Sequence, residues 1–390
     1  MAADIPSPLS DVAVLAEPTA AYVHVPFCAR RCGYCNFTLV AGRDDLIGPY
    51  LVALEKELSW LVAPRPVDTL FVGGGTPTHL APRQLDRLLK LATQWFPLNR
   101  EYELSVEANP IDIDAERVAV LVERGVNRVS LGAQSFRPAK LRLLERDHDR
   151  ETIEAAAELL RPAVGSLSLD LIFGAPGETL DDWRRDLEAA LALAPHHIST
   201  YGLTFELGTT FFARRSKGVL RPLDEDAERA MYEYAIDTLT ASGYEHYEVS
   251  NFALAGHRCR HNEAYWNADA YFAAGPGAAR YVDGVREANH KSTLAYLKRV
   301  GAGQSPVAER ERLDAEDRAR EALVLGLRRM QGVRLTAFAE RFGFSVRDLG
   351  DRALAKHLEQ GWLVLEGDRL RLTREGLMVS DSLWGEYLRR

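Results

Sequence analysis

Cysteine is scarce in this chain, with four residues among 390. Long apolar runs are missing as well, because no stretch approaches the roughly 20 residues that a membrane-spanning helix needs. The first 20 residues contain no Lys or Arg, which argues against a secretory signal and against an arginine-rich transit peptide. We therefore expect residues 1–20 to form a flexible tail and the protein to lack a transmembrane segment.

An excess of positive charge is also missing. The formal net charge is −8, so a general nucleic-acid-binding role is not favoured. Hydrophobic residues make up 46% of the chain and charged residues 27%, which is ordinary for a globular protein. A chain of 390 residues is long enough for a large core and one or two smaller domains.

Three of the four cysteines, Cys28, Cys32 and Cys35, lie together in the segment HVPFCARRCGYCNF. Thiolates grouped this closely in a loop are typical metal ligands, and three of them suit a 4Fe–4S cluster with one open iron. The C-x3-C-x2-C spacing also describes one face of a helix, although the Pro and Gly residues fit a loop better. Zinc, with His24 or a distant residue as fourth ligand, is a further alternative. Clustered unpaired thiols indicate a reducing compartment and predict a cytoplasmic protein.

Six strand-then-helix units follow one another through the first half of the chain, a pattern that predicts parallel strands with right-handed crossovers. A closed eight-fold barrel would need two further units, which we do not find. The polar and glycine-rich motifs all fall where a strand ends, which is where barrels and open α/β sheets carry their sites. The expected strands are 21–26, 69–72, 101–106, 126–131, 166–173 and 197–203, and the helices are 48–61, 82–96, 115–123, 150–160, 180–193 and 224–240.

The last part of the chain, residues 313–390, is expected to form a separate unit. Helices near 314–330, 335–342 and 348–360 precede a two-stranded wing that turns at Gly367–Asp368, so the unit resembles a winged helix. DNA binding is one interpretation, but balanced charge on the third helix is typical of a solvated face, and a lid over the barrel mouth is preferred. The expected division is a tail at 1–20, a barrel at 21–250, a connecting segment at 251–312 and this unit.

The cysteine loop resembles the cluster loop of radical S-adenosylmethionine (SAM) proteins. Within that superfamily it is similar to the oxygen-independent coproporphyrinogen III oxidases and the HemW-type heme chaperones, over about residues 21–390. The resemblance implies an α/β fold, a partial (β/α)6 TIM-like barrel of radical SAM type with a C-terminal winged-helix-like α+β domain. It also implies a 4Fe–4S cluster whose open iron binds SAM, and an electron donor for that cluster.

Matching to this family predicts nine residues that contact SAM or lie on its substrate side. The segment GGGTPT matches the motif that meets the methionine portion of SAM, and a carboxylate at a strand end matches the group that binds the SAM ammonium or ribose hydroxyls. Tyr34 is placed to stack on adenine. Each residue alone has an equal structural alternative. The nine are Tyr22, Tyr34, Gly74, Gly75, Thr76, Glu107, Gln134, Arg146 and Asp170.

Two motifs favour the heme chaperones over the oxidases. The oxidases commonly carry another cysteine two places after the third, where this chain has Phe37. The segment HNEAYW matches an HNxxYW motif linked to heme binding in the HemW group, and heme iron takes His or Cys as axial ligand. The alternatives are a loop histidine bonded to backbone and a small buried cysteine. The candidate heme residues are His261, Cys259, Asn262, Tyr265 and Trp266.

We therefore expect a HemW-like protein that binds a 4Fe–4S cluster, SAM and heme and delivers heme to an apo-hemoprotein, which can be membrane-associated. The alternative is an oxygen-independent coproporphyrinogen III oxidase, which decarboxylates two propionates of its substrate oxidatively. A zinc-stabilised interaction protein is a third class. The family often has a His in a GxGAHS-like turn where this chain has Ala279 in GPGAAR, so the ligand set can differ at that position.

Overall fold

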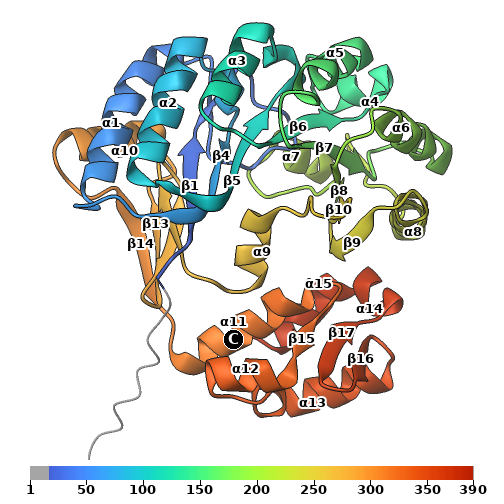
Figure 1. Cartoon of the computed structure of the whole chain (residues 1–390). Helices are drawn as coiled ribbons and strands as arrows, with labels where there is room; N and C mark the ends of the chain where they lie inside the picture. Colours follow the sequence, from blue (N-terminus) through green and yellow to red (C-terminus); the bar gives the residue numbers. More distant parts are fainter. Residues whose placement is uncertain (1–16, 390) are drawn as a thin grey trace, which may run out of the picture.

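A single mixed sheet of 12 strands organises most of the chain (Figure 1). The computed structural model describes residues 17–389, so the expected tail at 1–20 falls mostly outside the described residues, and Ala20 already begins the first strand. Seven central strands, from β11 to β8 in the order below, run parallel to one another. From edge to edge the strands are β14 (Val307–Arg312), β13 (Val285–Asn289), β12 (Ala279–Val282), β11 (Tyr271–Ala274), β1 (Ala20–Val25), β4 (Val67–Gly74), β5 (Leu98–Ala108), β6 (Arg128–Gln134), β7 (Ser166–Phe173), β8 (His197–Gly202), β10 (Asn251–Ala253) and β9 (Glu245–Glu248).

Six helices follow the six expected strands and cover the outer face of the sheet (Figure 1). The predicted partial (β/α)6 barrel is therefore confirmed, with element ends that differ from the expected ones by at most three residues. The helices are α1 (Ile47–Ser59), α2 (Pro82–Trp95), α3 (Ala115–Glu123), α5 (Arg150–Leu160), α6 (Leu180–Ala192) and α8 (Glu225–Ala241).

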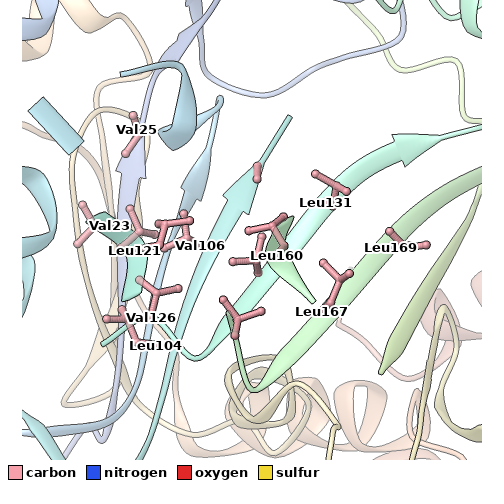
Figure 2. Packing of buried hydrophobic residues seen from close by; sticks show 14 of the residues in the cluster. Val23, Val25, Leu104, Val106, Leu121, Val126, Leu131, Leu160, Leu167 and Leu169 are labelled. Atoms are coloured by element: carbon pink, nitrogen blue, oxygen red, sulfur yellow. The ribbon is translucent and has the colours of Figure 1, made fainter. Parts of the chain in front are cut away.

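Apolar and polar residues alternate along the strands, so the sheet has one apolar face and one polar face. Every second residue is a fully buried Leu or Val that packs under the helices, for example Leu104, Leu131 and Leu169 (Figure 2). Truncating one such leucine to alanine typically costs about 2–5 kcal/mol, so this layer fixes the register of the strands. The residues between them, such as Ser130 and Asp170, point to the inner face, which is therefore polar.

The segment at 251–312 is more than a connection, because it adds strands on both sides of the barrel. β11 pairs with β1 as a seventh parallel strand, and β12 to β14 continue the sheet antiparallel. On the other side, the hairpin β9–β10 joins the sheet through β10, which pairs antiparallel with β8. Strands of three to five residues carry too little periodicity to be recognised in the sequence. Three further helices were not expected, α4 (Pro138–Leu143), α7 (Thr210–Ser216) and α10 (Thr293–Gly301).

The HNEAYW segment lies in a helix, α9 (Arg260–Trp266), and not in the loop that the alternative for His261 assumed. This helix lies between the inner face of the sheet and the C-terminal unit (Figure 1). It contacts β4 on one side and the first helix of that unit, α11 (Ala315–Leu327), on the other. Its seven residues are too few to show helical periodicity in the sequence.

The C-terminal unit has the expected helices and wing, together with a core of its own. The wing of β16 (Leu363–Glu366) and β17 (Arg369–Leu372) is joined by a short third strand, β15 (Val333–Arg334). Ion pairs from Arg374 to Asp237 and from Arg229 to Glu375 tie the unit to α8 of the barrel. Its other helices are α12 (Leu335–Phe342), α13 (Val346–Glu359), α14 (Arg374–Met378) and α15 (Ser380–Leu383). Across residues 17–389, no helix has the length and apolar character needed to cross a membrane.

Candidate functional site

A cavity of about 850 Å³ lies where the parallel strands end. The last residues of β4, β5, β6, β7 and β8 all contribute to its wall, as the placement of the motifs predicted. The cysteine loop closes one end of the cavity, and residues 377–382 of the C-terminal unit line the other end. A volume of this size is typical of sites that hold a cofactor or a small-molecule ligand.

All three cysteines of the loop line this cavity. The loop leaves β1 through the two-residue strand β2 (Phe27–Cys28), which pairs with β3 (Val40–Ala41). The Arg31 guanidinium then donates hydrogen bonds to three loop carbonyls, those of Cys35, Phe37 and Leu39, at 3.2, 3.4 and 2.8 Å. These bonds stabilise the loop that carries the three thiols.

Two residues outside the loop contact the cysteines, Thr76 after β4 and Arg146 after α4. The Cys28 sulfur lies 3.3 Å from the Thr76 hydroxyl, and an Arg146 amine donates to the Cys32 sulfur at 3.5 Å. Burial raises the pKa of the Cys28 thiol to about 11 and also raises the pKa of Cys35, whereas the positive charge of Arg146 lowers both. Metal binding removes these protons, because a coordinated thiol is held as thiolate.

The donor set fits a cluster better than a zinc ion. His24, the fourth zinc ligand considered from the sequence, has both ring nitrogens engaged, with the Tyr22 hydroxyl at 3.0 Å and the Thr38 carbonyl at 2.7 Å. Within residues 17–389 no three His, Cys, Asp or Glu side chains converge on the position of a single ion. Thiolates around a multi-iron cluster bind different irons, so they have no need to converge on one point.

Eight of the nine residues predicted around SAM line the same cavity as the cysteines. The exception is Tyr22, which lies on the inner face of β1 and bonds His24. The glycines have a steric reason to be there. A Cβ on Gly75 would come within 2.6 Å of the Phe27 carbonyl oxygen, so only glycine lets β4 end this close to the cysteine loop. The eight are Tyr34, Gly74, Gly75, Thr76, Glu107, Gln134, Arg146 and Asp170.

Two carboxyl groups face this cavity from β5 and β7, the strands on either side of β6. Glu107 accepts a hydrogen bond from the Gly74 amide at 2.7 Å, and Asp170 accepts from the Ser130 hydroxyl at 2.9 Å. Burial raises the pKa of Glu107 to about 7, and the nearby Asp170 charge adds to this rise. Burial likewise raises the pKa of Asp170. A bound cation would favour the charged form of both groups.

Arg146 is held by residues that the sequence analysis did not single out. One of its amines donates to Asn109 at 3.0 Å and to the Gly132 carbonyl at 3.1 Å, and His148 contacts the same Asn109 oxygen at 3.2 Å. Within the described chain the Arg146 Nε is buried without a hydrogen-bond partner, which fits an anionic ligand beside it. Asn109 follows Glu107 in EANP and His148 follows Arg146 in RDHD, so proximity in sequence was the available signal.

A buried ion cluster anchors the segment between Gln134 and Arg146. Lys140 of α4 contacts Glu178 at 2.5 Å and Asp186 of α6 at 3.1 Å, and all three side chains are almost fully buried. Asp186 also accepts hydrogen bonds from the Ser135 hydroxyl and the Phe136 amide, both at 2.7 Å. Because Ser135 directly follows Gln134, this cluster fixes the strand end that carries the predicted SAM residue.

The predicted heme residues do not join the cysteines at this cavity. His261 is buried in α9, with Nδ1 3.0 Å from the Thr69 hydroxyl and Nε2 3.0 Å from the Tyr265 hydroxyl. Cys259 is buried beside Glu103, and burial raises the pKa of its thiol to about 12. Burial lowers the pKa of His261 to about 3, so the ring is neutral. Both ring nitrogens are therefore occupied at the inner face of the barrel.

Comparisons with known proteins agree with this architecture. Residues 22–190 match the model of the radical SAM superfamily, and residues 313–379 match that of the HemN C-terminal domain. Heme chaperone HemW of Lactococcus lactis is 34% identical over 376 residues, which cover 96% of this chain and 98% of that protein. Heme chaperone HemW of Mycobacterium tuberculosis is 37% identical over 94% of both chains. The solved structure of coproporphyrinogen III oxidase (HemN) from Escherichia coli has the same fold, with a TM-score of 0.84 at 24% identity over 95% of this chain and 90% of that one.

Proposed function

Since this chain belongs to the HemW family within the radical SAM superfamily, we propose that it is a heme chaperone. It binds a 4Fe–4S cluster, SAM and heme, and it delivers heme to an apo-hemoprotein. The observation that carries this proposal is similarity over nearly the full length to proteins named heme chaperones. The residue at position 37 also supports the proposal, because the oxidases commonly carry a further cysteine there and this chain has Phe37. This residue lines the cavity and is 62% exposed.

The three thiolates of Cys28, Cys32 and Cys35 would hold three irons and leave the fourth open to SAM. When bound, the cluster supplies an electron that can cleave SAM. The residues of the chain orient the cofactor. Glu107, which accepts from the Gly74 amide, would bind the SAM ammonium, and the Gly74–Thr76 segment lines the cavity beside it. Arg146 balances the negative charge of the thiolates with its guanidinium.

The pH dependence of SAM binding tests the role of Glu107. Ionised Glu107 attracts the ammonium group, whereas the protonated carboxyl does not. With a pKa of about 7, SAM affinity should fall about tenfold between about pH 8 and pH 6. Isothermal titration of the anaerobic, cluster-loaded protein measures this dependence. Glu107→Gln should bind SAM more weakly and show a flat profile over the same range, and a flat profile in the wild-type protein would contradict the assignment.

Heme ligation by His261 or Cys259 stays a prediction. In this structure neither side chain is free to ligate a heme iron, because both ring nitrogens of His261 are bonded to Thr69 and Tyr265 and the Cys259 thiol lies against Glu103. Direct ligation would require α9 to leave the sheet. The proposed heme transfer therefore does not use these two residues as ligands.

Anaerobic titration with heme, followed by the Soret band, tests the proposed function. The cluster-loaded protein should bind heme saturably at one site and then pass it to an apo-hemoprotein added in excess. His261→Ala, checked for folding by circular dichroism, separates the two interpretations of the motif. Weakened binding together with a shifted Soret band in a folded variant supports ligation, whereas unchanged binding places the heme elsewhere. A wild-type chain without saturable heme binding would refute the chaperone function.

The second candidate is coproporphyrinogen III oxidation, which the shared fold with the Escherichia coli oxidase favours. Such an enzyme would remove two carboxyl groups from its substrate as carbon dioxide. Anaerobic incubation with coproporphyrinogen III, SAM and a reductant, followed by mass spectrometry, should show no loss of mass for a chaperone. A mass decrease corresponding to two decarboxylations would show that the protein is a coproporphyrinogen III oxidase and not a chaperone.

The recipient hemoprotein and the electron donor of the cluster are further partners of the proposed function. A reducing compartment such as the cytoplasm suits a protein whose cluster ligands are three partly buried, unpaired thiols.

A further inference from the structure

Arg328 stands out at the end of the cavity that lies away from the cysteine loop. It follows α11 of the C-terminal unit and lines the cavity together with Tyr232 of α8 and Met378 of α14. Among the described lining residues the other arginines, Arg30 and Arg146, lie at the cysteine end. Arg328 is therefore the basic group of the distal end, which is formed jointly by the barrel and the C-terminal unit.

The charge of Arg328 is poorly balanced by the protein. Its nearest carboxylate is that of Asp381 at 3.9 Å, and this side chain is 92% exposed, so solvent screens the pair. The buried Glu248 makes no ion pair with it, and one Glu248 oxygen accepts hydrogen bonds from Asn251 and Ser250 while the other has no partner among the described residues. Burial raises the pKa of Glu248 to about 7 and the charge of Arg328 lowers it, so this carboxyl group balances Arg328 only in part. Within residues 17–389 the buried Nε of Arg328 has no hydrogen-bond partner. A guanidinium left with free donors inside a cavity is suited to a carboxylate, which it can bind through two parallel hydrogen bonds.

The surroundings of Arg328 are apolar and partly aromatic. Phe173 and Tyr232 stack with ring centroids 5.9 Å apart and nearly parallel planes. Leu377 and Val379 of the C-terminal unit line the same end of the cavity. One cationic group beside flat apolar walls suits an amphiphilic ligand with a carboxylate on a planar ring system. A tetrapyrrole with propionate side chains has this chemistry.

Trp266, the last residue of the HNEAYW segment, packs against Arg328. The guanidinium lies over the indole ring, 4.8 Å from its centroid. At the other end of the same short helix, His261 is fixed by Thr69 and Tyr265. The C-terminal unit also holds the end of α9, since Arg329 and Arg341 of that unit both donate hydrogen bonds to Asn267. The motif thus connects the inner face of the barrel to the position of Arg328.

We propose that Arg328 binds a propionate of heme at the distal end of the cavity and that the HNxxYW motif acts on heme indirectly, with Trp266 as a positioning residue for Arg328. This inference rests on the proposed function and names a site for its ligand. It explains how a motif linked to heme can have both nitrogens of its histidine occupied by the protein.

Anaerobic titration of four proteins with heme and with heme dimethyl ester tests this site. The proteins are the wild type, Arg328→Gln, Arg328→Lys and, as control, Arg334→Gln, an exposed arginine of the same unit. Arg328→Gln should weaken heme binding about 10- to 100-fold, as expected for lost hydrogen bonds between charged groups. The ester should bind the wild type and Arg328→Gln equally, because it has no carboxylate to lose. Arg328→Lys should recover part of the affinity for heme, and the control should match the wild type.

Two further comparisons test the role of Trp266 and the position of the heme site. Trp266→Phe, which keeps an aromatic face, should bind heme better than Trp266→Ala, while Arg328→Gln should erase the difference between them. Equal heme affinity of the wild type and Arg328→Gln, or equal losses for heme and its ester, would overturn the site but leave the chaperone function standing. A wild type that binds neither heme nor a metal-free porphyrin with the same propionates would overturn both. Cluster content and thermal unfolding show whether each variant is folded.

Discussion

Replacing Cys28, Cys32 or Cys35 by alanine is expected to reduce the iron content of the reconstituted protein from about four atoms per chain to nearly none. With one thiolate missing, the cluster would lose one of only three protein ligands, and the open iron that SAM needs would disappear with it. Iron and sulfide analysis, the visible absorption of the anaerobic protein and a SAM titration measure this loss.

Cys259→Ala is the matched control, because it removes the one remaining cysteine of the chain. Its thiol is buried in the barrel beside Glu103 and does not line the cavity. This variant should keep full iron content and full SAM binding, with only a modest loss of stability. If Cys259→Ala also lost the cluster, the assignment of the three ligands would be wrong. Zinc in place of iron in the wild type would contradict the cluster itself.

Lys140→Met is expected to lower the free energy of unfolding by about 3–5 kcal/mol, because it leaves two buried carboxyl groups without their cation. Glu178 and Asp186 both contact Lys140, and neither has access to solvent that could replace it. The deficit should shrink at low pH, where protonation removes the unpaired charges. Denaturant unfolding at neutral and acidic pH measures the effect.

The same substitution should weaken SAM binding, since Asp186 holds the strand end next to Gln134. Lys356→Met provides the comparison. This lysine pairs with Glu386 at 2.7 Å on the surface of the C-terminal unit, where an ion pair contributes less than about 1 kcal/mol. If Lys140→Met lowered stability and SAM binding as little as Lys356→Met does, the buried ion cluster would not be what anchors the segment between Gln134 and Arg146.

The barrel could be predicted from the sequence because each of its strands is long and its apolar residues alternate. Ser166–Phe173 is an example, and its predicted bounds are those of β7. The placement of glycine and acidic motifs at strand ends then predicted the cavity, since parallel strands bring those ends together. The nine SAM candidates came from matching to a family, and eight of them meet in one place.

Other parts could not be predicted because their order depends on distant contacts. α9 is a helix of seven residues whose partners, Thr69 and Glu103, lie far away in the sequence. No local pattern distinguishes His261 in a buried network from His261 on a loop. Arg328 is similar, since only the packing of the C-terminal unit against the barrel places this residue in the cavity.

The pairing of β1 with β11 has a consequence for the order in which the protein matures. Ala20 lies opposite Tyr271, so the strand that precedes the cysteine loop remains unpaired on one side until most of the chain has left the ribosome. Contacts this distant in sequence form late, because closing such a long loop must be offset by contacts that exist only afterwards. We therefore expect iron–sulfur insertion to follow near-complete synthesis, because a nascent chain truncated before β11 would carry its cysteine loop next to a strand that is still unpaired on one side.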